Sequence, residues 1–250
     1  MKRKITKLFA LLLVGGAFML AGCGNNSGLN VNVDGNYQDS TKEVFTTYVE
    51  QVDDNKKFDA PGYEFSLVTE STGDTKIKVT TSGKIVKTIN EGGEEDAIAY
   101  FNMKSELDGQ KMDFNSYVAN GYFYTEVNGV KVKESLSKLY DDDQFSQIMT
   151  MIPSKSEITE MFTQFEKLGN VSVKVSQDGE MTKYMVAFEN STSEGSMAMQ
   201  VYYVFKSDAI YGLKMISNAN MDSEVAKITL DIQVYDGTIE LPSFDDYIEA

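Results

Sequence analysis

Short runs of alternating apolar and polar residues, joined by turn-forming dipeptides, constrain this fold more than any other feature. Tyr63, Phe65 and Leu67 alternate with Glu64 and Ser66, and a period of two indicates a half-buried strand. Asp-Gly and Asn-Gly reach the positive φ angles of tight hairpins at little cost, so consecutive strands should pair as neighbours. These dipeptides lie at Asp108-Gly109, Asn120-Gly121, Asn128-Gly129, Asp178-Gly179 and Asp236-Gly237.

The alternating runs fall into two sets on either side of a helical middle. We expect five or six strands in each set, about 11 in all. The first set lies between Gly62 and Val127 and the second between Val171 and Tyr235. A further strand at Thr238–Pro242 would be terminal or at an edge, because its proline cannot donate to a ladder.

Three segments show helical spacing. Val44, Phe45, Tyr48, Val49 and Val52 predict an amphipathic helix, with Ser40 or Thr41 as its cap. A second segment, 136–152, is predicted to form two short helices or one bent helix around Asp141–Asp143. Ser154 and Glu157 predict a capping box for a third helix. Its apolar stripe is Ile158, Met161, Phe162, Phe165 and Leu168, and Gly169 is expected at the C′ position.

The expected fold class is α+β, a large curved antiparallel sheet of about 11 strands with helices packed on its concave face. A sheet of that size should curl into a half-barrel, because strongly twisted open sheets rarely stay flat. Residues 40–250 are expected to form this single domain. The helices either fill the concave side completely or leave a cavity for acyl chains or another apolar ligand.

The first 23 residues predict export. Lys2, Arg3, Lys4 and Lys7 precede an apolar run that ends at Leu20, and small residues lead directly to Cys23. The pattern resembles the lipobox of bacterial lipoproteins, which implies a signal peptide over residues 1–22 and a diacylglyceryl group on Cys23. Two acyl chains give stable anchoring to a membrane. The alternatives are an ordinary secretory signal with a chance cysteine, or a spanning helix, for which the run is short.

Residues 23–39 are rich in glycine and asparagine and are predicted to form a flexible tether. The expected location is the extracytoplasmic face of the cell membrane, held there by the lipid.

Composition narrows the function classes. The precursor has a net charge of −15, and loss of four basic signal-peptide residues takes it to −19. A phosphate backbone binds cationic proteins, and this chain is strongly anionic, so nucleic acid is excluded as a partner.

The chain has no histidine, which removes the usual general base and zinc ligand. We therefore expect no enzyme, no cofactor and no metal. Asp141–Asp143 suggests calcium but lacks EF-hand spacing, and a solvated helix start is favoured.

The order of elements resembles the LolA-type lipoprotein-carrier fold, over roughly residues 40–247. Its kin include uncharacterised Gram-positive lipoproteins and the mycobacterial LppX/LprG lipoproteins. The closing segment Ile239–Tyr247 and the lipobox carry the local resemblance. The resemblance implies a half-barrel with a helical lid that carries a lipid or a lipidated molecule. A tethered chain departs from a soluble carrier and would hold lipid or hand it on locally.

Strand residues that share an apolar face are the candidate ligand-binding residues. They are Phe101, Met103, Met112, Phe114, Tyr122, Tyr124, Met197, Met199, Val201, Tyr203, Leu213 and Met215. Methionine side chains adapt to ligands of irregular shape, although methionines and aromatic residues in strands usually belong to the hydrophobic core.

Two functions stay open: lipid binding or transfer, and a cell-envelope scaffold that binds an envelope protein partner. A carboxylate hydrolase is disfavoured, because no converging acidic pair is evident.

Overall fold

The computed structural model describes residues 29–53, 60–72, 76–89, 95–108, 110–127, 129–136, 153–193, 195–221 and 224–249. The predicted signal peptide, Cys23 and Asp141–Asp143 lie outside these residues. So does most of the helical segment predicted around the three aspartates.

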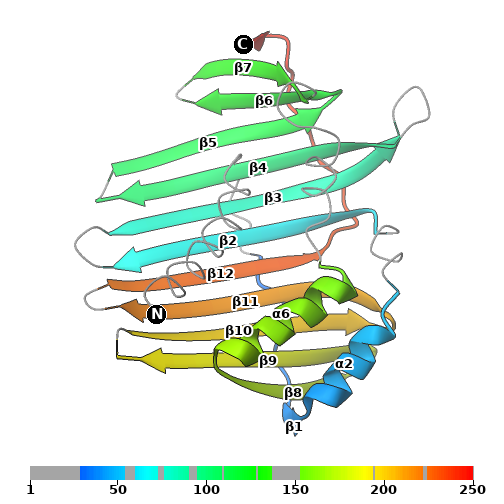
Figure 1. Ribbon diagram of the computed structural model, residues 1–250. Helices are drawn as coiled ribbons and strands as arrows, with labels where there is room; N and C mark the ends of the chain where they lie inside the picture. Colours follow the sequence, from blue (N-terminus) through cyan, green and yellow to red (C-terminus); the bar gives the residue numbers. More distant parts are fainter. Residues whose placement is uncertain are drawn as a thin grey trace.

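The described residues form one sheet of 13 strands (Figure 1). Its strands are β1 (Gln38–Ser40), β2 (Gly62–Thr72), β3 (Ile77–Ile89), β4 (Glu95–Leu107), β5 (Gln110–Ala119), β6 (Tyr122–Val127), β7 (Val130–Ser135), β8 (Asn170–Asp178), β9 (Met181–Thr192), β10 (Gly195–Lys206), β11 (Ala209–Met221), β12 (Glu224–Val234) and β13 (Ile248–Glu249). The predicted fold class, α+β with helices on one face of a large curved sheet, is confirmed.

Two meanders make up this sheet, β2–β7 and β8–β12, and they join where β12 pairs antiparallel with β2. The only parallel pair in the described sheet joins β13 to β7. Three strands were not predicted: β7, which lies beyond the predicted end of the first set at Val127, and the short edge strands β1 and β13. Thr238–Pro242, predicted as a strand, is irregular instead. It leaves the ladder after β12 and leads the chain across the sheet to β13.

Two described helices pack on the β8–β11 half of the sheet (Figure 1). Helix α2 (Lys42–Glu50) begins at Thr41, whose hydroxyl accepts the Val44 N–H. Helix α6 (Lys155–Leu168) begins with the predicted capping box of Ser154 and Glu157. Together with the sheet they close the main hydrophobic core.

Gly169 ends α6 for a reason other than the predicted one. Its backbone is extended (φ −174°), so the left-handed C′ conformation is not used. A Cβ at this position would lie 2.3 Å from the Glu189 carbonyl oxygen on β9. The residue is glycine because the chain passes so close to the neighbouring strand.

The two faces of the sheet differ. One row of cross-strand partners runs from Tyr184 through Tyr203, Leu213, Ile232 and Phe65 to Phe101. Partners opposite each other share a face, and this row lies under the helices at its β9–β10 end. We call this side the helix face and the other the outer face.

Residues 29–37, which belong to the predicted tether, lie against the outer face; we call them the N-terminal strap. The Val31 side chain is only 2% exposed, and its N–H donates to Asp231 Oδ1 at 2.9 Å. Lys183 Nζ donates to the Asp34 carbonyl at 2.7 Å. The tether prediction is therefore wrong for these residues, because buried charged groups of β9 and β12 bind them. Residues 23–28 of the predicted tether are outside the described part.

Candidate ligand-binding face

Ten of the twelve candidate ligand-binding residues share the helix face. On β4 and β5 these are Phe101, Met103, Met112 and Phe114, and on β10 and β11 they are Met197, Met199, Val201, Tyr203, Leu213 and Met215. The two groups come from different meanders, and the β12–β2 pair places them on one continuous surface. The alternation of apolar residues therefore predicted their common side correctly.

Tyr122 and Tyr124 lie on the outer face, which corrects the prediction for both. Phe123 is the partner of Val118 and takes the helix-face position on β6. A shift of one residue moves a strand's whole side-chain set to the other face. The Tyr124 ring instead stacks on Phe244 with 3.8 Å between centroids, and the Tyr247 ring meets it edge-on. Burial raises the pKa of Tyr124.

The β9–β10 part of the helix face is closed by protein. Phe45 of α2 packs on Tyr184 and Tyr203, with ring centroids 5.3 and 5.6 Å away. Tyr203 is 1% exposed, and burial raises the pKa of its hydroxyl. Val201 and Met199 are equally buried. These candidates form core, so they supply no surface to a ligand.

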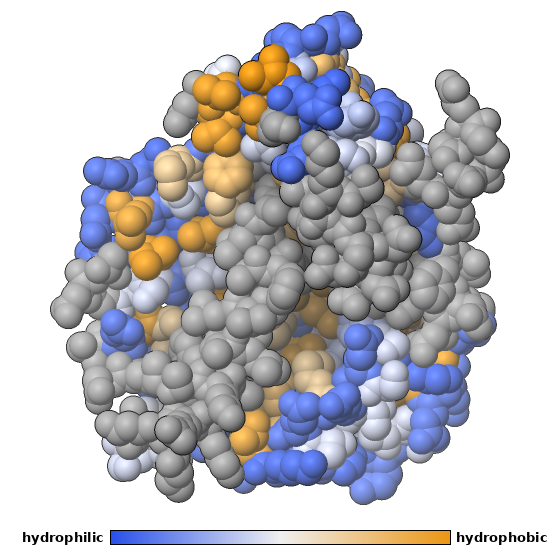
Figure 2. Space-filling view, turned by 45° about the horizontal axis from the view of Figure 1, so that its top comes forward, coloured by the Kyte–Doolittle hydropathy of each residue, from blue (hydrophilic) through white to orange (hydrophobic). Residues whose placement is uncertain are grey.

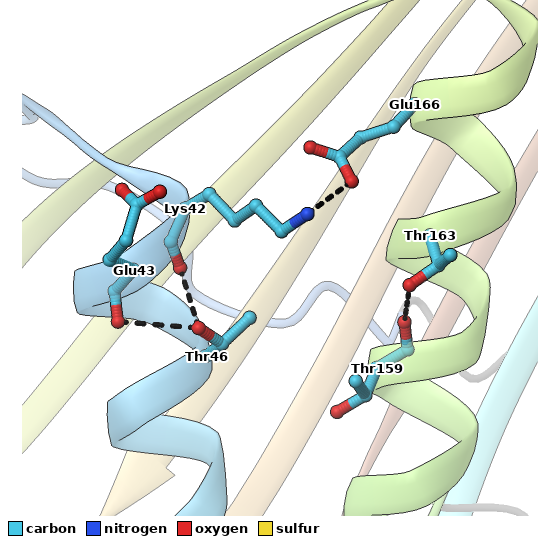
Figure 3. Close-up of polar contacts among 6 residues, drawn as sticks. All are labelled: Lys42, Glu43, Thr46, Thr159, Thr163 and Glu166. Carbon is cyan, nitrogen blue, oxygen red and sulfur yellow. Dashed lines mark hydrogen bonds and ion pairs between the residues drawn. The ribbon is translucent and has the colours of Figure 1, made fainter.

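The α2–α6 pair presents a polar outer surface above that core (Figure 3). Lys42 and Glu166 form an ion pair between the two helices, and both side chains are more than one-third exposed. Thr163 donates its hydroxyl to the Thr159 carbonyl at 2.9 Å within α6. An exposed pair of this kind stabilises little, so burial of Phe45 and Phe162 holds the helices down.

The β3–β5 part of the helix face is different. Met103 and Phe114 are half-buried, and Met112 is 61% exposed. Ile77 and Leu107 are opposite each other and exposed, and Val127 and Val130 form the same kind of pair at the β6–β7 turn. We call these five exposed residues (Ile77, Leu107, Met112, Val127 and Val130) the apolar rim. It lies at one end of the helix face.

No charged side chain occupies the described helix-face positions between this rim and the middle of the sheet. The register assigns to that face alternate residues from Ile77 to Ile85, from Ala97 to Leu107 and from Gln110 to Val118. All are apolar, glycine, glutamine or hydroxyl-bearing. Hydrophobic surface is visible between hydrophilic residues in Figure 2, seen obliquely from the side of the helices.

Gly83 on β3 lets two aromatic rings approach over this surface. It lies between its partners Phe65 and Phe101, whose ring centroids are 6.3 Å apart. A Cβ on Gly83 would lie 2.8 Å from the Phe65 ring and 3.0 Å from the Phe101 ring. The absence of a side chain thus allows these rings to meet where the β3–β5 surface joins the core.

Thr81 is a residue of this surface that the sequence reasoning missed. Its side chain is 1% exposed, and among the described residues its Oγ1 has no hydrogen-bond partner. The signal was present: Thr81 follows Ile77 and Val79 in the apolar positions of β3. A buried hydroxyl with no partner is uncommon in folded proteins.

Comparison with known proteins gives a distant likeness. No family model and no curated protein matches the chain. Among solved structures it is similar to LprF from Mycobacterium bovis, at 13% identity and a TM-score of 0.41, covering 83% of this chain and 99% of that one. It is also similar to the S-type phycobiliprotein lyase CPES from Guillardia theta, at 8% identity and a TM-score of 0.19, covering 78% and 99%. At these values, arguments about function rest on the chain's own residues.

The described residues contain no group of three or more histidine, cysteine, aspartate or glutamate side chains placed to hold a metal ion. No helix among them has the length and apolar character needed to cross a membrane.

Proposed function

We propose that this chain is a non-enzymatic lipoprotein that binds or transfers a lipid or another apolar ligand on the β3–β5 part of its helix face. The observation that carries the proposal is the uncharged surface that runs from Thr81 and Met103 to the exposed Leu107 and Met112. Removing apolar area from water contributes about 25 cal/mol per Å². An acyl chain laid on this surface would cover side chains that now contact solvent.

Methionine suits such a surface. Met103 and Met112 lie on neighbouring strands of the same face, and their unbranched side chains adapt to ligands of irregular shape. The β9–β10 residues, by comparison, are fixed under α2 and α6. We therefore assign ligand contact to Met103, Met112 and Phe114, and a supporting role to the buried candidates.

The proposed location is the extracytoplasmic face of the cell membrane, with Cys23 carrying a diacylglyceryl anchor. The signal-peptide pattern before Cys23 supports it. The same proposal includes membership of the LolA-like and LppX/LprG-like group, supported by the order of elements and by the closing segment 239–247.

Native mass spectrometry tests the proposal. The chain is produced without residues 1–22 and with Cys23→Ser, which keeps every residue of the described fold. We expect a discrete added mass that an organic extract identifies as lipid. Met103→Glu places a charge on the uncharged surface and should abolish the added mass. Met185→Glu, at a half-buried position of the outer face, is the matched control and should retain it.

The alternative is a scaffold lipoprotein with no ligand. Protein free of added mass, both as purified and after incubation with phospholipid vesicles, would contradict lipid binding. In that case the exposed rim would be the surface for an envelope protein partner, and crosslinking in intact cells would recover that partner.

A further inference from the structure

Thr81 lies at the inner end of the proposed ligand surface, toward the middle of the sheet. Its cross-strand partners are Leu67 on β2 and Met103 on β4, neither of which offers a side-chain oxygen or nitrogen. Along β3 the same face carries Val79 and Gly83. The hydroxyl therefore lies among apolar neighbours, with less than 2% of the side chain exposed.

A hydroxyl buried without a partner costs free energy, because water no longer satisfies it. An ordered water is one partner that could restore the bond, but a buried water needs two to four polar contacts. Thr69 and Ser105 are the nearest hydroxyls in the register, each one diagonal step away as the partners of Val79. Diagonal neighbours lie about 7–8 Å apart at their Cα atoms, too far for a direct bond from either side chain to Thr81.

We propose that Thr81 is a specificity residue that donates its hydroxyl proton to an oxygen of the ligand. The ligand class is an acyl ester: the ester carbonyl accepts from Thr81 Oγ1, and the hydrocarbon chain lies along the helix face toward Ile77 and Leu107. This inference rests on the proposed function and names the ligand chemistry of the same surface.

The strand register gives the length of surface along which the acyl chain would lie. Thr81 and Ile77 are four residues apart on one strand, a span of about 13 Å at roughly 3.3 Å per residue. Ile77 and Leu107 are partners at the end of that span, and both are exposed. A chain whose ester lies at Thr81 therefore reaches the apolar rim, where solvent or a membrane meets the fold.

A pair of probes that differ only in the acceptor tests the inference. Methyl palmitate has an ester carbonyl, and heptadecane has a similar chain without one. Both are offered in excess to the Cys23→Ser chain lacking residues 1–22, after removal of bound lipid, and binding is measured by native mass spectrometry. We expect the wild type to prefer the ester about 2- to 10-fold, the range that one net hydrogen bond provides.

Thr81→Val keeps the branched shape and removes the hydroxyl, and it should abolish the preference while heptadecane still binds. Thr81→Ser, which keeps a hydroxyl, should retain part of the preference for the ester. Thr80→Val removes a hydroxyl from the other face of the same strand and should leave the preference intact. Equal binding of both probes by wild type and Thr81→Val would overturn the inference alone, whereas no binding of either probe would overturn the proposed function.

Stability of the ligand-free protein gives a second readout. Because Thr81 Oγ1 has no partner among the described residues, Thr81→Val should leave the urea midpoint unchanged or raise it. A lower midpoint would show that the hydroxyl is bonded in the free protein, by protein or by water, and would overturn the inference.

Discussion

Lys214 Nζ lies 2.9 Å from Asp231 Oδ1 on the neighbouring strand, and the same carboxylate oxygen accepts the backbone N–H of Val31. Lys214 also donates to Asn30 Oδ1 at 2.7 Å. One buried ion pair thus binds the N-terminal strap to strands that come almost two hundred residues later in the chain.

Removing one partner of that pair should destabilise the fold strongly. Asp231→Ala leaves the Lys214 ammonium buried without its carboxylate and frees the Val31 N–H. We expect a loss of about 3–5 kcal/mol in the free energy of unfolding, measured by urea denaturation. The double variant Lys214→Met, Asp231→Leu should recover most of it, because no buried charge remains. A single variant as stable as wild type would contradict the burial of the pair.

The capping box of α6 should have a measurable effect on stability. Ser154 Oγ accepts the Glu157 N–H, and the Glu157 carboxylate accepts the Ser154 N–H at 2.6 Å. Ser154→Ala should cost about 1 kcal/mol in urea denaturation. Thr159→Ala, which removes an exposed hydroxyl that donates to the Lys155 carbonyl of the same helix, is the control and should lower stability by less. Equal effects would mean that the cap contributes nothing specific.

Truncation of the Tyr124 side chain should lower the stability of the fold and leave ligand binding unchanged. Its buried ring packs on Phe244 and Tyr247, on the face opposite the proposed ligand surface. Tyr124→Ala should lower the free energy of unfolding by about 3–5 kcal/mol, as for other buried aromatic truncations. The bound mass in native mass spectrometry at low temperature should persist. Its loss from protein that is still folded by circular dichroism would contradict this placement.

The pH dependence of the C-terminal segment follows from Lys131 and Asp246. Their side chains are 2.8 Å apart, and this hydrogen bond lowers the pKa of Asp246 from 3.8 and raises that of Lys131 from 10.5. The carboxylate contribution is complete above about pH 4 and is lost as pH falls through the lowered pKa of the folded state. The lysine contribution is complete below about pH 10 and is lost as pH rises through its raised pKa.

Asp246→Asn tests this pH dependence. The difference in melting temperature between wild type and variant should be constant near neutral pH and vanish at the acidic end. Because Asp246 is exposed and Lys131 is only half-buried, the difference should also shrink in high salt. A difference that persists unchanged at the acidic end would contradict the assigned pair.

Local pattern predicted much of this fold, because turn chemistry and alternation act between neighbours in sequence. The Asp-Gly and Asn-Gly turns and the Ser154–Glu157 box depend on residues within a few positions of each other, and α6 and four of the five hairpins formed as expected. Asp236-Gly237 joins no hairpin, because the chain leaves the sheet after β12. The β12–β2 pair that joins the meanders is a long-range choice, and alternation alone does not specify it.

The errors share a physical origin. Alternation divides the residues of a strand between two faces but does not show which face is inward, so Tyr122 and Tyr124 were predicted as ligand residues. In the structure Phe123 has the inward position, opposite Val118. The strap was predicted to be a flexible tether because the residues that bind it, Lys183, Lys214 and Asp231, are distant in sequence and no local pattern indicates them. Thr81 was passed over because a threonine in a strand is ordinary until its lack of a partner is seen in three dimensions.

The bound strap also limits the distance between the fold and a bilayer. With an anchor at Cys23, at most the six residues before Leu29 could separate the fold from the lipid, because Val31 is already bonded to β12. At about 3.5 Å per residue the greatest separation is roughly 20 Å, against roughly 60 Å if residues 23–39 were all free. An anchored molecule of this kind would stay within reach of the lipid headgroups.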